Sequence, residues 1–260
     1  MPLLYHDTYE GFVKAFHSLS GLDLKFYKQN QMQRRIISFM NARGYSTFPD
    51  FLQALDQDQN LYDAFFKHLT INVSQFFRDA NQWTTLRQKI VPLLTAGKTS
   101  VKIWSAGCSG GQEPYSMAIM LTEYFPTIRF KVLATDIDEN VLAQAKRGFY
   151  KKPDFASTPP ELLQKYFIPA QNGYQINDQI RQSVVFQKQN LLTDKFDRDF
   201  DLIACRNVVI YFTEAAKEVL YRKFVESLQP GGILFTGSTE HLFGQQTLGL
   251  KAVSPFFYRK

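Results

Sequence analysis

The first 90 residues carry apolar side chains at the three- and four-residue spacing of amphipathic helices. Three runs show it: Phe12, Phe16 and Leu19; Met32, Ile36, Phe39 and Met40; and Phe51, Leu52 and Leu55. Because an α-helix turns every 3.6 residues, each run lines one helix face. Helix-breaking positions at Gly21, Gly44 and Pro49 separate the runs. We therefore expect an all-helical N-terminal domain over residues 1–90.

After the polar stretch TAGKTS (95–100), short apolar runs alternate with helical segments. The apolar runs are VKIWSAG, FKVLATDID, SVVFQKQNLL, FDLIACRN and GGILFTGS. Strands that alternate with helices indicate an α/β fold, a parallel sheet with helices on both faces. We expect this domain over residues 91–260. Inside it, an Asn-Gly pair and a second polar turn at NDQ predict a small antiparallel β insertion at about 170–187.

Composition indicates an ordinary soluble globular protein. The 260 residues are 45% hydrophobic, no apolar run approaches the length of a membrane helix, and the first residues lack the layout of a secretory signal. We expect a cytoplasmic protein without direct membrane insertion. Cys108 and Cys205 form no CxxC pair, and the histidines lack ligand spacing, so we expect no metal site and no disulfide framework. The histidines are His6, His17, His68 and His241.

The segment WSAGCSGGQEPYS (104–116) places a glycine turn between a strand and a helix, as in the cofactor sites of open α/β sheets. Gly107, Gly110 and Gly111 match neither the dinucleotide pattern nor a P-loop. Glu113 would repel a polyphosphate in a partly buried site, and it favours a ligand with positive charge.

An acidic residue at the end of the next strand, Asp136, follows Gly107 by 29 residues. A carboxylate there can accept two ribose hydroxyl hydrogen bonds. A ribose together with a cationic group suggests S-adenosylmethionine, and the turn LQPGGILF (228–235) is common near the end of methyltransferase domains. Taken singly, the glycine cluster is also compatible with a purely structural turn, and DID with a helix cap.

Six segments together resemble the CheR-type chemotaxis receptor methyltransferases. They are INVSQFFRD (71–79), WSAGCSGGQEPYS, LATDIDENVLAQAKRGFY (133–150), NLL (190–192), FDLIACRNVVIYF (200–212) and PGGILFTGSTEHL (230–242). The resemblance implies a Rossmann-like class I methyltransferase sheet. It also implies a protein-glutamate O-methyltransferase that transfers the methyl group of S-adenosylmethionine to glutamates on the cytoplasmic helices of chemoreceptors. The products are glutamate methyl esters and S-adenosylhomocysteine, and the expected location is the receptor array.

The resemblance also assigns residues. The implied cofactor contacts are Asn72, Ser74, Arg78, Glu113, Asp136, Asn190, Leu191, Arg206 and Asn207, and Gly107 joins them because the loop glycines give the cofactor room. Tyr211 matches the aromatic residue that the family places by the reacting methyl group. Arg78 could guide the substrate carboxylate with a bidentate fork. The alternatives are an interdomain salt bridge for Arg78 and a core aromatic for Tyr211.

Partner docking is expected on a basic helix near the N-terminus. The net charge is +6, and no acid occurs between Leu24 and Pro49. Lys28, Arg34 and Arg35 there form a candidate docking face for acidic receptor helices, and a merely solvated helix face is the alternative. The segment GYQINDQIRQSVVF looks too short for the longer hairpin that docks a receptor C-terminal tail in some family members, so we do not expect tail docking.

The chemistry needs little from titratable side chains, because a glutamate nucleophile with a reference pKa of about 4.3 is already ionised near pH 7. The two cysteines are expected to be reduced fillers, or else to line the cofactor edge. A nucleic-acid methyltransferase is a rival interpretation prompted by the basic pI of 9.1. The motifs typical of nucleic-acid methyltransferases do not occur in this sequence, so we expect no nucleic-acid partner. A cofactor-sensing module without turnover is the other rival.

Overall fold

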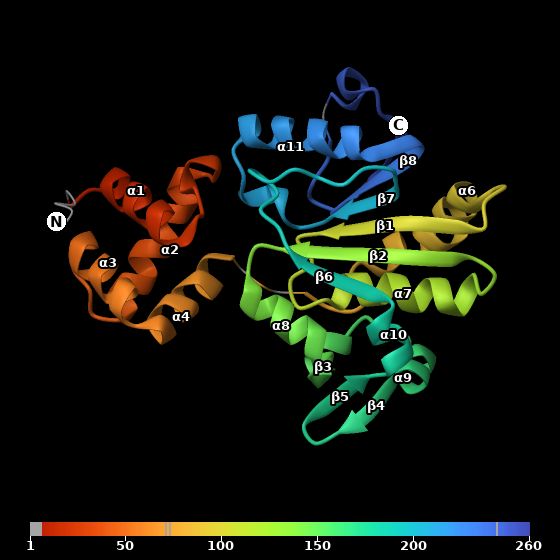
Figure 1. The fold of residues 1–260 in the computed structure, drawn as a ribbon, viewed down its shortest axis with the longest axis horizontal. Helices are drawn as coiled ribbons and strands as arrows, with labels where there is room; N and C mark the ends of the chain where they lie inside the picture. Colours follow the sequence, from red (N-terminus) through yellow and green to blue (C-terminus); the bar gives the residue numbers. More distant parts are fainter. Residues whose placement is uncertain (1–6, 71, 73, 243) are drawn as a thin grey trace. The chain divides into compact units, whose positions relative to one another are not determined.

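The structure is a computed structural model that describes residues 7–70, 72, 74–242 and 244–260. Its contacts divide the chain into two compact units, shown in Figure 1. The first comprises the chain up to Asn72 with Tyr211–Lys217, and the second comprises the rest. The expected boundary near residue 90 instead falls within a helical stretch of the second unit. Helical periodicity alone could not reveal this, because the helices before the first strand pack on the sheet.

The first unit is helical, as expected. Its elements are α1 (Tyr9–Ser20), the 3-10 helix η1 (Leu24–Phe26), α2 (Gln29–Ala42), α3 (Phe48–Gln57) and α4 (Gln59–Thr70). Thr8 caps α1 by accepting the Gly11 amide at 3.1 Å, and Gly21 ends it in a left-handed conformation. The predicted apolar positions are buried except Leu19, which is 37% exposed. Phe51 and Phe65 meet edge to face at 4.9 Å in this core.

The second unit is built on a sheet of seven strands in the order β6-β2-β1-β7-β8-β10-β9. The strands are β1 (Ser100–Ala106), β2 (Arg129–Asp136), β6 (Val184–Lys188), β7 (Phe200–Cys205), β8 (Leu228–Thr236), β9 (Lys251–Ser254) and β10 (Phe257–Arg259). The first five strands in that order are parallel, and β10 and β9 are antiparallel additions. The expected Rossmann-like α/β sheet is confirmed, although it is mixed rather than wholly parallel.

The helices that follow α4 in the chain are α5 (Ala80–Thr85), the π-helix η2 (Leu86–Ile90), α6 (Val91–Thr95), α7 (Gln112–Tyr124), α8 (Glu139–Arg147), η3 (Lys152–Phe155), α9 (Pro160–Tyr166), α10 (Asp178–Gln182), η4 (Val209–Tyr211), α11 (Glu214–Ser227) and η5 (Gln245–Leu248). The main sheet is covered by α6, α7, α8, α10 and α11 (Figure 1). Neighbouring residues of β1 point to opposite faces. Ile103 joins the core cluster that contains Met117 of α7, whereas Trp104 packs against Phe224 of α11 at 5.4 Å. Both faces therefore carry buried apolar side chains.

A second, three-stranded antiparallel sheet has the order β3-β5-β4. Its strands are β3 (Phe149–Tyr150), β4 (Phe167–Ala170) and β5 (Gly173–Ile176). The predicted small insertion therefore exists; Gln171 and Asn172 form the turn between β4 and β5, and Gly173 of the Asn-Gly pair begins β5. The expected bounds of 170–187 were wrong at both ends, because β6 pairs in parallel with β2 and the strands Phe149–Tyr150 and β4 lie earlier. A local alternation pattern cannot tell which sheet a strand joins.

Candidate active site

The ends of the parallel strands bring most of the predicted residues of the second unit to one edge of the sheet. The chain runs from β1 outward to β2 and β6, and in the other direction to β7 and β8. This reversal between β1 and β7 is a topological switch point, where open α/β sheets bind ligands. The ends of four of these strands and the segments that follow them carry the predicted cofactor residues, which are Gly107, Glu113, Asp136, Asn190, Leu191, Arg206 and Asn207.

The glycine loop follows β1 and turns tightly against neighbouring strands. The amides of Gly107 and Cys108 both donate to the Thr135 carbonyl, at 2.8 and 2.9 Å. Gly107 has φ +77°, and a Cβ there would lie 2.5 Å from Cγ2 of Val208. Both the backbone conformation and the close approach therefore require glycine.

A hydrogen bond from a buried tyrosine supports the point at which the loop enters α7. Gly111 precedes the helix with φ +87°, and the hydroxyl of Tyr150 donates to the Gly110 carbonyl at 2.7 Å. Gln112 is only 5% exposed. Its Oε1 has no hydrogen-bond partner among the described residues. A buried acceptor without a partner is costly, so a ligand donor or a water at this point would stabilise the loop.

Glu113 uses both carboxylate oxygens inside the protein. Its Oε1 accepts from the Ser105 hydroxyl at 2.8 Å, and its Oε2 pairs with Nη1 of Arg206 at 3.1 Å. Arg206 also donates from Nη2 to Asp79 Oδ2 at 2.9 Å and to Gln82 Oε1 at 2.8 Å. The charge of this buried guanidinium is thus balanced by two carboxylates, and Glu113 ties β1 to the loop after β7.

Asp136 lies at the end of β2 with its carboxylate facing the glycine loop. It accepts the Ser109 amide at 2.8 Å and the Asp138 amide at 3.0 Å. A carboxylate has about four lone-pair sites, so acceptor capacity remains for ribose hydroxyls. Burial raises the pKa of Asp136 to about 6, although these amide bonds oppose the shift. Asp138 caps α8 instead, which confirms the capping reading for that one acid of DID.

Asn190 and Leu191 lie in the loop that follows β6. The preceding amide of Gln189 donates to the Asp136 carbonyl at 2.9 Å, so this loop lies beside the end of β2. The side chain of Asn190 accepts the Leu192 amide at 3.0 Å, and the Leu191 carbonyl accepts Nζ of Lys223 at 2.9 Å. These bonds fix the loop whose residues are predicted to contact the cofactor.

Four non-glycine residues with left-handed backbone lie next to predicted cofactor residues in the chain or within the glycine loop. Phe77, Asp79, Ser109 and Asn207 have φ values of 54°, 64°, 49° and 60°. Such conformations cost on the order of 1–3 kcal/mol each, and they cluster at functional sites. The carbonyl of Arg78, between Phe77 and Asp79, accepts from Trp83 Nε1 and Arg206 Nη2, both at 2.9 Å. The Arg78 segment is therefore fastened to the loop after β7, and the nearby Ser74 is half-buried.

Sequence analysis missed Glu240, which follows β8. Its carboxylate is 4% exposed and accepts three amides, from Asn207 at 2.7 Å and from Val209 and Gly237 at 2.9 Å each. Burial raises the pKa of Glu240, against these hydrogen bonds. The residue was visible in the motif GSTEHL, but no local pattern connected it with the loop after β7.

The remaining predicted residues belong to the first unit. They are Lys28, Arg34, Arg35, Asn72 and Tyr211, and the position of the last two relative to the second unit's residues stays a prediction. The Tyr211 carbonyl accepts the Lys28 amide at 2.9 Å within that unit. Arg34 is exposed and Lys28 half-buried, whereas the guanidinium of Arg35 donates to the His68 carbonyl of α4. The guanidinium of Arg35 thus helps to join α2 to α4. The prediction that placed Arg35 on a docking face did not include this structural role.

Both thiols are buried. Cys205 ends β7 and Cys108 lies in the glycine loop, with exposures of 1% and 2%. Burial raises the pKa of each thiol well above its usual value, and both are free. No His, Cys, Asp and Glu group suited to a metal ion occurs among the described residues, and His6 lies outside them. No described helix combines the length and apolarity needed to span a membrane.

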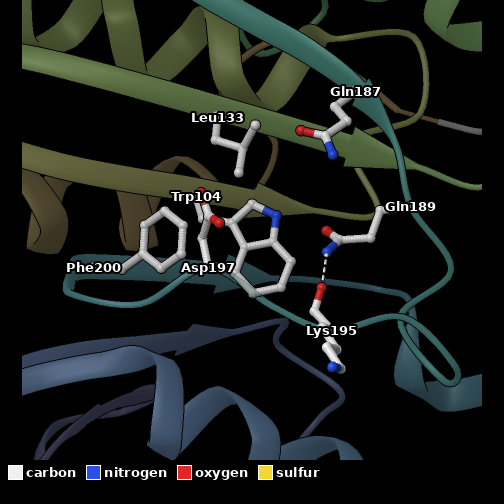
Figure 2. Close-up of a pocket in the computed structure, with 7 residues that line it drawn as sticks. All are labelled: Trp104, Leu133, Gln187, Gln189, Lys195, Asp197 and Phe200. Atoms are coloured by element: carbon white, nitrogen blue, oxygen red, sulfur yellow. Dashed lines mark hydrogen bonds between the residues drawn. The ribbon is translucent and has the colours of Figure 1, made fainter.

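A pocket of about 50 Å³ lies on the Trp104 face of the sheet (Figure 2). Its lining consists of Trp104, Leu133, Gln187, Gln189, Lys195, Asp197 and Phe200. Figure 2 shows the amide of Gln189 bonded to the Lys195 carbonyl, at 3.1 Å. None of the predicted cofactor residues lines this pocket, so it is separate from the glycine loop.

The residues at the strand ends fit a cationic nucleoside better than a phosphate. The guanidinium of Arg206, which lies beside the loop, is already paired with Glu113 and Asp79. Asp136 offers acceptors for a diol, and Gln112 Oε1 offers an unused buried acceptor beside the loop. This set of acceptors suits S-adenosylmethionine, which has a ribose diol and positive charge but no phosphate.

Comparison with known proteins agrees with this geometry. Residues 7–70 match the model "CheR methyltransferase, all-alpha domain", and residues 72–254 match "CheR methyltransferase, SAM binding domain". The chemotaxis protein methyltransferase of Listeria innocua is 41% identical over 241 residues, which cover 92% of each chain. Its counterpart in Borreliella burgdorferi is 32% identical, covering 98% of this chain and 94% of the relative. That of Escherichia coli K12 is 32% identical, covering 88% and 82%. The chain therefore belongs to the CheR methyltransferase family, the S-adenosylmethionine-dependent methyltransferases of chemotaxis.

Proposed function

We propose that the protein methylates glutamate side chains on the cytoplasmic helices of chemoreceptors during chemotactic adaptation. The products are glutamate methyl esters and S-adenosylhomocysteine, and the site of action is the cytoplasmic receptor array. The observation that carries this proposal is the glycine loop flanked by the buried carboxylates of Glu113 and Asp136. It supports a sulfonium cofactor, and the curated relatives are named chemotaxis protein methyltransferases.

When bound, S-adenosylmethionine supplies an electrophilic methyl group on a sulfonium. A glutamate acceptor has a reference pKa of about 4.3, so it is ionised near pH 7 and needs no general base. The protein's task is then to hold the acceptor oxygen in line. Orientation of this kind can supply on the order of 7–11 kcal/mol of barrier lowering.

Each proposed site residue has a task within that scheme. Asp136 binds the ribose hydroxyls, and Glu113 supplies negative charge near the positive end of the cofactor. Arg78 guides the substrate carboxylate with its planar fork, because a guanidinium matches a carboxylate with two parallel hydrogen bonds. Tyr211 orients the carboxylate or the sulfonium face through its hydroxyl.

The receptor is expected to dock on the basic side of the first unit. Arg34 is exposed on α2, and Lys28 precedes that helix. Acidic receptor helices would be attracted to these charges, which raises the association rate and favours the correct partner. We do not expect docking of a receptor C-terminal tail, because the β4–β5 hairpin has only the Gln171-Asn172 turn at its tip.

One experiment separates this function from its rivals. The protein is incubated with S-adenosylmethionine labelled on the methyl group and with receptor-containing membranes, and the products are treated with base. Volatile labelled methanol is expected, since carboxyl esters hydrolyse in base. Base-stable label would indicate N-methylation and overturn the proposal, and an absence of label alongside normal cofactor binding would favour a binding module. Receptors with the acceptor glutamates changed to alanine provide the control.

A further inference from the structure

The loop after β7 contains one left-handed backbone position. Asn207 has φ 60°, a conformation that asparagine adopts more readily than most non-glycine residues but that still costs energy. The amides of Asn207 and Val209 point toward one buried carboxylate, that of Glu240. This loop also carries Arg206, which holds Glu113 and Asp79.

We propose that Glu240 is a positioning residue of the cofactor site, which fixes Asn207 and Arg206 for S-adenosylmethionine by anchoring the backbone of the loop after β7. The proposal rests on the cofactor role of that loop within the proposed function. Glu240 does not need to touch the cofactor, because it acts through the loop.

Three short hydrogen bonds support this role. Oε2 of Glu240 accepts the Asn207 amide at 2.7 Å and the Gly237 amide at 2.9 Å, and Oε1 accepts the Val209 amide at 2.9 Å. Charge-assisted bonds of this kind are about twice as strong as neutral ones. A carboxylate can accept all three, because it has about four lone-pair sites and carries no donor.

Gly237 supplies independent support, since it leaves space for this carboxylate. A Cβ at Gly237 would lie 2.5 Å from Oε2 of Glu240 and 2.9 Å from the amide nitrogen of Asn207. Only glycine therefore lets the end of β8, the carboxylate and the Asn207 backbone meet. Gly237 does not have a positive φ, so an alanine there meets a steric conflict alone.

Loss of the Glu240 carboxylate should impair cofactor binding, whereas loss of a purely structural buried acid should lower only the folding stability. Replacing Glu240 by glutamine puts an amide donor among three backbone donors, and the loop loses part of its anchor. Asn207 is then free to leave its left-handed conformation, which moves a predicted cofactor contact. The effect should appear in ligand binding by folded protein and not only in stability.

Calorimetry with S-adenosylhomocysteine tests this without any methyl acceptor, so the result is independent of the receptor substrate. We expect the Kd to rise at least tenfold in Glu240→Gln and in Gly237→Ala, at a temperature where circular dichroism and thermal melting show both variants folded. Glu240→Asp, which keeps the charge on a shorter side chain, should lie between wild type and Glu240→Gln. Glu226→Gln on α11 makes the same chemical change at an exposed position and should bind like the wild type.

Two results would overturn the proposal. The first is an unchanged Kd in folded Glu240→Gln with a lowered melting temperature, since that pattern belongs to a purely structural acid. The second is normal binding in Gly237→Ala, because the displaced carboxylate would then be irrelevant to the site. Should Glu240→Gln not fold, Gly237→Ala and Glu240→Asp decide the matter alone. Labelled-ester formation, measured separately, reports on the proposed substrate.

Discussion

Arg206 and Glu113 form a buried ion pair, with Nη1 and Oε2 3.1 Å apart. The two residues are separated by 93 positions in the chain, and the pair joins the helix after the glycine loop to the loop after β7. A buried charge that loses its partner is costly, because no water replaces the lost interaction. This pair therefore holds together two segments of the predicted cofactor site.

Glu113→Gln should lower both stability and cofactor affinity. The glutamine keeps one acceptor oxygen but leaves Arg206 with Asp79 as its single carboxylate partner. We expect the free energy of unfolding to fall by about 2 kcal/mol, the usual scale for a buried charge-assisted hydrogen bond. Urea unfolding measures this change, and calorimetry with S-adenosylhomocysteine measures the loss of affinity. Glu161→Gln, an exposed change of the same kind, should alter neither.

Gly107→Ala should be more damaging than Gly97→Ala. Both glycines have a left-handed φ, +77° and +73°, so the backbone cost of about 1–2 kcal/mol is shared. A Cβ at Gly107 also meets Val208 at 2.5 Å, whereas no atom of the described residues outside its chain neighbours lies within 4 Å of one at Gly97. This overpacking adds about 1–3 kcal/mol, measured as the difference between the two variants in urea unfolding. Adding Val208→Ala should restore part of the loss, and equal losses in both single variants would remove the steric explanation.

Cofactor affinity should fall below pH 6, because the pKa of Asp136 is raised to about 6 by burial. Ribose hydroxyls donate to the ionised carboxylate, so protonation weakens binding, with the Kd for S-adenosylhomocysteine rising toward about tenfold per pH unit. The contribution of Asp136 to folding stability depends on pH in the opposite direction, because it decreases as the pH rises. The folded state binds this proton more tightly than the unfolded state, so the contribution is complete below the ordinary value of 3.8 and is lost as pH rises through 6.

Calorimetry between pH 5 and pH 8 measures the binding profile, with Asp136→Asn as the matched variant. That variant should bind more weakly at pH 8 and show little pH dependence. A wild-type slope that persists in Asp136→Asn would assign the titration to another group.

Arg34→Glu and Arg35→Glu should have different effects, although the residues are adjacent in sequence. Arg34 is exposed, so its reversal should raise the KM for receptor about tenfold at low ionic strength and leave the melting temperature unchanged. Arg35 donates to the His68 carbonyl, and its reversal should lower the melting temperature by separating α2 from α4. Steady-state methylation at several salt concentrations, together with thermal melting, checks both outcomes, because screening by salt should shrink only the Arg34 effect. Identical KM changes in the two variants would contradict this division of roles.

Much of the fold follows from local patterns in the sequence. The apolar stripe of α2 is buried as its spacing predicts, and Asn172 of the Asn-Gly pair lies in the turn between β4 and β5. The glycine loop and Asp136 were predicted at strand ends because each follows a short apolar run, where open α/β sheets place their ligand-binding turns. These signals lie within one turn or one strand, where neighbouring residues alone set the conformation.

The pairing of distant segments was not predictable in the same way. The start of the run SVVFQKQNLL was assigned both to the α/β pattern and to the expected insertion, and it forms β6, which hydrogen-bonds to β2 of the main sheet. Residues 80–90 were expected in the helical N-terminal domain, yet they belong to the second unit. Periodicity reports which face of an element is buried, and it carries no information about the element that covers that face.

The sequence by itself determined the helices of the first unit, the α/β character of the second and the chemical type of the cofactor loop. The tertiary structure decided that Glu113 pairs with Arg206, that Arg35 donates a hydrogen bond to α4 and that Glu240 accepts the amide of Asn207. The physical reason is the range of the forces involved. Backbone propensity and side-chain alternation act within a few residues, whereas a buried charge takes the partner that strand order brings within hydrogen-bond distance.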